Sequence, residues 1–255
     1  MSWQEWYTRY AKYYHILDGA SVDYFQFAKK LDMIFKKHKI KKILDFACGI
    51  GNLSIELKKL GYDVIGVDLN KAMINEALLN SKKEKVSFEI IERDLRKDFI
   101  GKFDAIICTY NYVGHFSKEE FIKIIDNFKR NLNKGGLIFF DIFNFRFMDK
   151  KFKDDLFIDA SRTINEISAT RFNQNKLDKK NKVMKINQIT FIEDRTLKMY
   201  NDSWDLKIYT LEEINKILED NFEIIEIYGS IFGDSMLCPY SDDKECIVIL
   251  GKLKN

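Results

Sequence analysis

The segment spanning residues 42–70 constrains the fold more than any other part of the chain. An apolar run at 42–47 leads into a turn at 48–51, leucines recur at helical spacing over 52–60, and a second apolar run occupies 63–67. The pattern predicts a strand, a glycine turn, a helix and a second strand. This order is typical of a nucleotide-type cofactor site in an α/β fold.

The two glycines of the turn and the acid after the second strand indicate what this segment binds. Gly49 and Gly51 let the backbone take positive φ or approach a bulky ligand closely, because neither carries a β-carbon. Asp68 follows the second strand, where a carboxylate can accept hydrogen bonds from both hydroxyls of a ribose. The start of the helix adds unpaired N–H groups.

A dinucleotide is a poor match to this turn. Dinucleotide sites have Gly-x-Gly-x-x-Gly, whereas Ser54 stands here at the third glycine position. Asp45 lies four residues before Gly49, and its charge would repel a pyrophosphate. The same carboxylate would suit an ammonium group.

The run Asp45-Phe46-Ala47-Cys48-Gly49-Ile50-Gly51 resembles the first motif, Asp-x-x-x-Gly-x-Gly, of the class I S-adenosylmethionine-dependent methyltransferases. The resemblance extends from about residue 10 to the end of the chain. It implies a Rossmann-like, seven-stranded α/β sheet with an amino-terminal helical lid and an inserted antiparallel β-sheet. It also implies S-adenosyl-L-methionine as the cofactor.

The resemblance assigns roles to residues around the cofactor. Asp45 would hold the methionine amino group, Asp68 the ribose and Asp94 the adenine amino group, although Asp94 could instead be a solvated loop acid. The expected cofactor-binding residues are Asp45, Ala47, Gly49, Gly51, Asn52, Asp68, Leu69, Met73, Asp94, Leu95 and Tyr110.

The loop after the expected fourth strand (103–109) should face both cofactor and substrate, because ligands of doubly wound sheets lie beyond the carboxyl ends of the strands. It lacks the Pro-Pro pair of methyltransferases that modify DNA bases. Residues 110–116 instead resemble the small-molecule branch, especially the amino-sugar N,N-dimethyltransferases, which have a histidine at the place of His115. The expected inserted sheet is similar to one in these enzymes and in related archaeal-type methyltransferases. We expect His115 to be catalytic, accepting a proton, although a lone histidine is often only structural.

The amino-terminal residues are rich in aromatic side chains at helical spacing, from Trp3 to Tyr14, and a second helix is expected over 22–37. These side chains could simply pack on the core. The resemblance favours a lid over residues 1–40 and gives Tyr14 a second catalytic role.

The rest of the chain divides into a core and an insertion. The methyltransferase core is expected over 41–150 and 207–255. Alternating residues within 151–206 predict an antiparallel sheet of about three strands, which should cover the substrate side or form a subunit contact. The expected substrate-binding residues are Asn111, Tyr112, Phe116, Arg146, Trp204 and Tyr240.

Composition limits the partners. The 42 Lys and Arg residues against 39 Asp and Glu give a net charge of +3, which is too small to indicate DNA binding. The four cysteines show no zinc spacing, so no metal is expected. No apolar run reaches the ~20 residues that span a membrane, and the start is not a signal peptide, so we expect a cytoplasmic monomer or homodimer.

These observations predict methyl transfer from S-adenosylmethionine to an N or O atom of a small molecule. Two alternatives remain: a methyltransferase that modifies RNA or protein, and a cofactor-binding regulatory or scaffold protein without turnover.

Overall fold

The computed structural model describes residues 2–94 and 96–254. A central sheet has the strand order β11-β12-β5-β4-β1-β2-β3, with β11 and β12 antiparallel to their neighbours and the other pairs parallel. Its seven strands are β1 (Lys42–Phe46), β2 (Asp63–Asp68), β3 (Glu89–Glu92), β4 (Phe103–Cys108), β5 (Leu132–Phe143), β11 (Phe222–Tyr228) and β12 (Cys246–Leu253). The predicted seven-stranded α/β fold is therefore confirmed.

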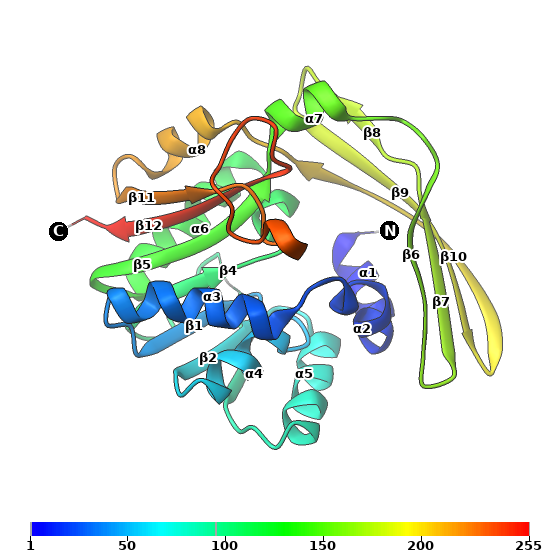
Figure 1. Cartoon of the computed structure of the whole chain (residues 1–255), viewed down its shortest axis with the longest axis horizontal. Helices are drawn as coiled ribbons and strands as arrows, with labels where there is room; N and C mark the ends of the chain where they lie inside the picture. Colours follow the sequence, from blue (N-terminus) through cyan, green and yellow to red (C-terminus); the bar gives the residue numbers. More distant parts are fainter. Residues whose placement is uncertain (1, 95, 255) are drawn as a thin grey trace.

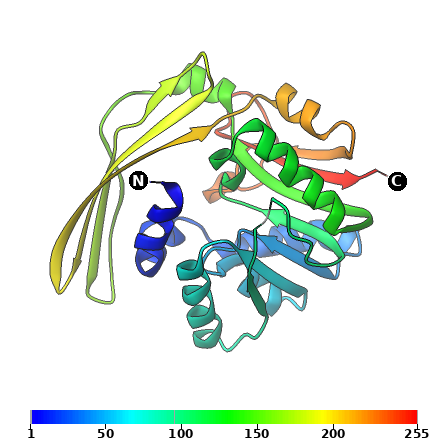
Figure 2. The ribbon, with the colours of Figure 1, turned by 180° about the vertical axis from the view of Figure 1, so that it is seen from behind.

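Helices cover both faces of the central sheet. One layer packs α3 (Tyr24–Lys37) and α4 (Asn52–Lys59) on the strands, and the other packs α6 (Lys118–Asn131) and α8 (Leu211–Leu218). Figure 1 shows α3 in front of the sheet, and Figure 2 shows α6 on the opposite face. A further helix, α5 (Lys71–Lys83), follows β2.

Capping residues set where several helices begin. Ser117 and Glu120 form a capping box at α6, and Thr210 and Glu213 form another at α8. A short helix, α7 (Phe145–Lys151), follows β5.

The inserted sheet is larger than the sequence predicts. It has five strands, not about three: β6 (Phe157–Ile164), β7 (Ile167–Asn173), β8 (Lys176–Asp178), β9 (Val183–Asp194) and β10 (Thr196–Lys207). A register shift between Ile158 and Ala160 interrupts the alternation of β6, which hides that strand. The short β8 lies in a polar segment that reads as a turn.

The amino-terminal helices lie between the two sheets (Figures 1 and 2). They comprise α1 (Trp3–Tyr10), the 3-10 turn η1 (Ala11–Tyr13), α2 (Tyr14–Leu17) and the 3-10 turn η2 (Gly19–Ser21). On one side, Arg9 and Tyr10 both donate to the buried Asp202 of β10, at 2.8 and 2.7 Å. On the other, the Asn70 amide donates to Gln4 and Thr8. The helices thus bridge the core and the inserted sheet.

Within residues 2–94 and 96–254, no helix is long and apolar enough to cross a bilayer.

Candidate active site

A cavity of about 410 Å³ opens at the carboxyl ends of β1 and β2, beneath α1. Its lining residues come from the glycine turn, the start of α5, the loop after β4 and the amino-terminal helices. Of the predicted cofactor-binding residues it contains Asp45, Ala47, Gly49, Asn52, Asp68, Leu69, Met73 and Tyr110.

Positive φ angles shape the turn between β1 and α4. Gly49 and Gly51 have φ values of 54° and 81°, and Ala47 also lies in the left-handed region at 70°. Such a conformation is unfavourable for alanine and persists only where neighbouring contacts impose it. The N–H groups of Ala47 and Cys48 both donate to the carbonyl of Val67, at 2.8 and 3.0 Å. The turn is therefore fixed against β2 before any ligand binds.

Asp68 lies where a ribose would need an acceptor. Its two carboxylate oxygens accept from the backbone N–H groups of Gly49 (2.9 Å) and Asn70 (2.8 Å). Burial nevertheless raises the pKa of Asp68 to about 6, because these two bonds only partly offset desolvation. Each oxygen keeps further lone pairs for hydroxyl donors.

Asp45 supplies the second carboxylate of this cavity. It is 3% exposed and accepts from the Ser54 hydroxyl, while burial raises its pKa to about 7. In the described part of the chain, neither Asp45 nor Asp68 forms an ion pair with a lysine or arginine. A ligand with an ammonium group and vicinal hydroxyls would satisfy both, so the residues present fit S-adenosylmethionine.

The adenine end differs from the expectation. Met73 and Leu69 line the cavity, but Asp94 does not. Its carboxylate is held by Arg96 at 3.0 Å, and this bond lowers the pKa of Asp94. Glu92, at the end of β3, lines the cavity instead. Gly51 is the N-cap residue of α4 and does not line the cavity. Leu95 lies outside the described residues.

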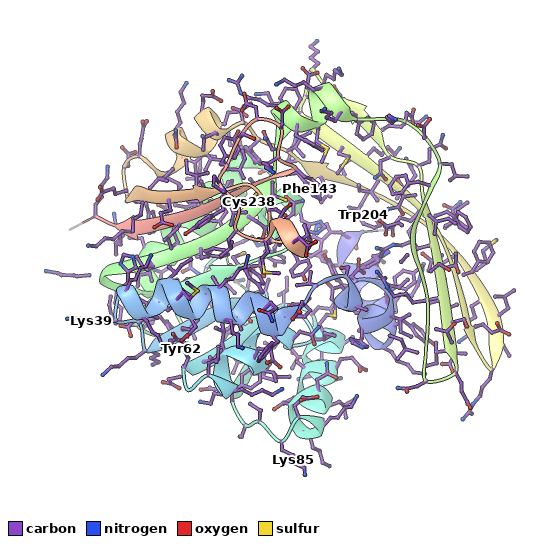
Figure 3. All side chains as sticks on the ribbon, viewed as in Figure 1. Lys39, Tyr62, Lys85, Phe143, Trp204 and Cys238 are labelled. Atoms are coloured by element: carbon purple, nitrogen blue, oxygen red, sulfur yellow. The ribbon has the colours of Figure 1, made fainter. Side chains whose placement is uncertain are left out.

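A second cavity of about 490 Å³ adjoins the first. Tyr7, Tyr14 and Tyr110 line both, so the cavities meet at three phenol rings. The other lining residues come mainly from the amino-terminal helices, the end of β5 and the inserted sheet. Figure 3 labels Phe143 of the core and Trp204 of the inserted sheet, which belong to the same lining and pack on one apolar cluster. We call these the cofactor cavity and the acceptor cavity.

Two consecutive residues with a left-handed backbone lie at the junction between the cavities. Tyr110 and Asn111 have φ values of 69° and 51°. Both of their N–H groups donate to the buried carboxylate of Asp141 at the end of β5, at 2.7 and 2.9 Å. Asp141 thus holds a strained turn in place, and burial raises its pKa to about 7.

His115 lines the acceptor cavity. Its Nε2 lies 3.3 Å from the Tyr7 hydroxyl, and its ring stacks on Trp3 with centroids 4.7 Å apart. Burial lowers the pKa of His115 to about 3, so the imidazole is neutral at physiological pH.

Several polar atoms in the wall of the acceptor cavity are buried without a hydrogen-bond partner in the described structure. They are Asn111 Nδ2, His115 Nδ1, Asn173 Oδ1, Asn175 Oδ1 and Trp204 Nε1. Proteins seldom leave so many buried polar atoms unpaired in one place. These atoms indicate a polar ligand.

Four predicted site residues lie elsewhere. Tyr112, expected at the substrate, lines the cofactor cavity. Phe116 packs against Trp3 and Tyr112 outside both cavities, because its ring completes an aromatic cluster. Arg146 pairs with Glu212 at the surface, and Tyr240 donates to Asp242. Neither Arg146 nor Tyr240 lines either of these two cavities.

Sequence reasoning missed other lining residues. Tyr7 and Trp3 both belong to the aromatic residues at helical spacing near the amino terminus. Nothing in the sequence distinguishes them from residues that pack on the core. Asn173 lies at the end of a strand, and no motif marked it. Arg171, also missed, is buried in the acceptor cavity between Asp18 and Asp159, so its charge is compensated there.

Comparison with known proteins agrees with this geometry. Residues 43–136 match the family described as "Methyltransferase domain". A glycine/sarcosine N-methyltransferase of Halorhodospira halochloris is 32% identical over 114 residues, which are 43% of this chain and 42% of the relative. A Bacillus subtilis relative is 30% identical over 130 residues, which are 49% of this chain and 52% of that protein. The chain therefore spans about half the length of the curated relatives it matches.

Solved structures show a similar fold over nearly the whole chain. An S-adenosylmethionine-dependent methyltransferase from Clostridium acetobutylicum has a TM-score of 0.81 at 21% identity, covering 98% of this chain and 99% of that one. An amino pentose methyltransferase from Micromonospora echinaspora has a TM-score of 0.72 at 14% identity, covering 92% and 93%. The chain has the fold of the class I S-adenosylmethionine-dependent methyltransferases. The match of residues 43–136 to a methyltransferase domain supports S-adenosylmethionine as the cofactor.

Proposed function

We propose that this protein transfers the methyl group of S-adenosylmethionine to a small polar molecule bound in the acceptor cavity. The observation that carries the proposal is the junction at Tyr7, Tyr14 and Tyr110, where one cavity that fits the cofactor meets another with unpaired polar atoms. Methyl transfer requires such an arrangement, because donor carbon and acceptor atom must meet in line at about 3 to 3.5 Å.

The walls of the acceptor cavity favour an acceptor molecule with several uncharged polar groups. Asn111 and Trp204 present donors, and Asn173 presents an acceptor oxygen. Arg171, the buried cation of the wall, is already neutralised by two carboxylates. Hydroxyl groups on the acceptor would pair with these atoms without the cost of burying a further charge.

The chain's own residues would bind, orient and desolvate the reactants. When bound, S-adenosylmethionine supplies an electrophilic methyl group on a sulfonium. Asp45 would hold its ammonium and Asp68 its ribose. Burial raises the pKa of Tyr14 and of Tyr110, so their phenols stay neutral at the junction. Rings at the junction also exclude water, and the sulfonium is less stabilised there than in bulk water, which favours the loss of its charge on transfer.

Methyl incorporation tests the proposal against its two alternatives. Purified protein with tritiated S-adenosylmethionine is offered a panel of hydroxylated amines, then transfer RNA, then a protein extract. We expect label in a small amine. Label in RNA or protein would identify the first alternative, and tight cofactor binding without any transfer would identify a scaffold.

The similarity to an amino pentose methyltransferase supports amines as the first acceptors to try. The volume of the acceptor cavity, about 490 Å³, is in the range of small-molecule sites, which also favours a small acceptor over a macromolecule.

A further inference from the structure

Tyr7 and His115 form a contact between the two cavities that no sequence motif marks. The Tyr7 hydroxyl lies 3.3 Å from His115 Nε2. Tyr7 lines both cavities, whereas His115 lines the acceptor cavity and its Nδ1 is buried there without a partner. Trp3 stacks on the imidazole and fixes the plane of the ring.

A neutral imidazole carries one proton, and its position decides what His115 can do. If Nε2 carries the proton, it donates to the Tyr7 oxygen. The Tyr7 O–H and the Nδ1 lone pair then both lack a partner in the described structure. If Nδ1 carries the proton, the Tyr7 O–H donates to Nε2 and only the Nδ1–H is left over. Because each unpaired buried group costs free energy, the second arrangement is the more stable.

We infer that Tyr7 is a positioning residue that holds His115 as the Nδ1–H tautomer, so that the histidine presents a hydrogen-bond donor to the acceptor cavity. This differs from the expectation that His115 accepts a proton. The Nδ1–H would bind a lone pair of the acceptor molecule, such as an oxygen beside the reacting atom.

The tautomer also bears on the reacting atom, and this consequence alone rests on the proposed function. A hydroxyl nucleophile must lose its proton to a base. The Nδ1–H group of His115 cannot be that base, because its nitrogen already carries a proton. A neutral amine attacks through its own lone pair: the new C–N bond forms as the C–S bond breaks, the electron pair goes to sulfur, and the product ammonium later gives its proton to water. The donor role of His115 therefore favours nitrogen over oxygen as the acceptor atom.

Nitrogen NMR of the histidine rings tests the inference without any acceptor. The chain has three histidines, so ¹⁵N-histidine labelling gives a simple spectrum, and His115→Asn assigns the signals of His115. We expect a neutral ring protonated at Nδ1 between about pH 5 and pH 8. In Tyr7→Phe, which lacks the O–H donor, we expect the Nε2–H form to become populated.

Tyr13→Phe is the matched control. Tyr13 lies in the same helical segment, but its hydroxyl donates to Asp194 rather than to His115, so the ring signals should not change. An Nε2–H tautomer in the unmodified protein would overturn the inference, as would an unchanged His115 spectrum in folded Tyr7→Phe. Should Tyr7→Phe not fold, the spectrum of the unmodified protein decides alone. Failure to methylate any amine would contradict the proposed function but leave the tautomer result standing.

Discussion

The carboxylate of Asp141 accepts a 2.7 Å hydrogen bond from the backbone N–H of Tyr110, and through it the end of β5 holds the residue at which the two cavities meet. A second bond, from the N–H of Asn111, completes the support. The junction is therefore maintained by a side chain from a neighbouring strand rather than by its own backbone preference.

We predict that Asp141→Ala releases this turn. Both N–H groups would lose their acceptor, and the left-handed backbone would relax. The free energy of unfolding should fall by about 2 to 4 kcal/mol, since two hydrogen bonds to a buried acceptor are lost. Urea denaturation measures the change, and methyl transfer by the folded variant should be strongly reduced. Unchanged stability and rate would show that the turn holds itself.

Asp68→Ala should weaken cofactor binding at least about 100-fold, because the acceptor for the ribose hydroxyls and the anchor of the Gly49 N–H are both removed. Titration calorimetry with S-adenosylmethionine measures the affinity. Asp63→Ala is a suitable control, because Asp63 begins the same strand and its carboxylate is exposed. Equal affinities for Asp68→Ala and the native protein would remove Asp68 from the site.

Cofactor affinity should rise between about pH 5 and pH 8. Burial raises the pKa of Asp45 from 3.8 to about 7, so the free folded protein holds a proton there that the unfolded chain releases. The stability that the folded protein gains by holding this proton is fully present below about pH 4 and is lost as the pH rises through 7.

Cofactor binding acts on the same proton. A bound ammonium favours the ionised carboxylate of Asp45, so cofactor binding near pH 6 releases protons.

Calorimetry in buffers of different ionisation enthalpy measures that proton release. Asp45→Asn should bind the cofactor more weakly and release fewer protons. Asp68, whose pKa burial raises to about 6, accounts for the remainder. A pH-independent affinity in the native protein would argue against an ammonium at Asp45.

Substitutions at His115 should separate a donor from a base. His115→Asn places an amide N–H near the position of Nδ1, whereas His115→Ala removes all polar atoms. We expect both variants to bind S-adenosylmethionine normally. We compare turnover of the amine that accepts most label in the incorporation screen. His115→Asn should keep turnover within about 10-fold of the native rate, and His115→Ala should reduce it about 100-fold. Equal loss in both would favour proton acceptance by the imidazole.

Asp202→Asn should loosen the amino-terminal helices. Asp202 accepts from both Arg9 and Tyr10, and it is 2% exposed. We expect a loss of about 2 kcal/mol in the free energy of unfolding and faster amide hydrogen exchange in α1. Lys12→Ala, which removes an exposed pair with Asp194, should leave both measurements unchanged. If amide hydrogen exchange in α1 is as slow in Asp202→Asn as in the native protein, other contacts hold the amino-terminal helices in place.

The sequence predicts the parts of this protein that depend on local patterns. The turn at Gly49 and Gly51 and the position of Asp68 follow from spacing along residues 42–70, and the structure has both. The fold class follows from the same segment.

Features that depend on distant contacts are not visible in the sequence. Asp94 has the spacing of a cofactor ligand, but Arg96 occupies its carboxylate. The contact of Tyr7 with His115 joins residues 108 positions apart. Asn173 faces the acceptor cavity only because β7 pairs with β9. Such proximity arises from tertiary packing, for which a single sequence carries no local signal.

The origin of the two linings has an evolutionary consequence. Most of the cofactor cavity belongs to residues 43–136, whereas the acceptor cavity takes only Tyr110, Asn111 and His115 from that range among its described lining residues. Under the proposed function, mutations in the flanking segments would therefore change which molecule is methylated, while the residues that line the cofactor cavity stay as they are. Descendants of one ancestral gene could in this way acquire new acceptors one wall at a time.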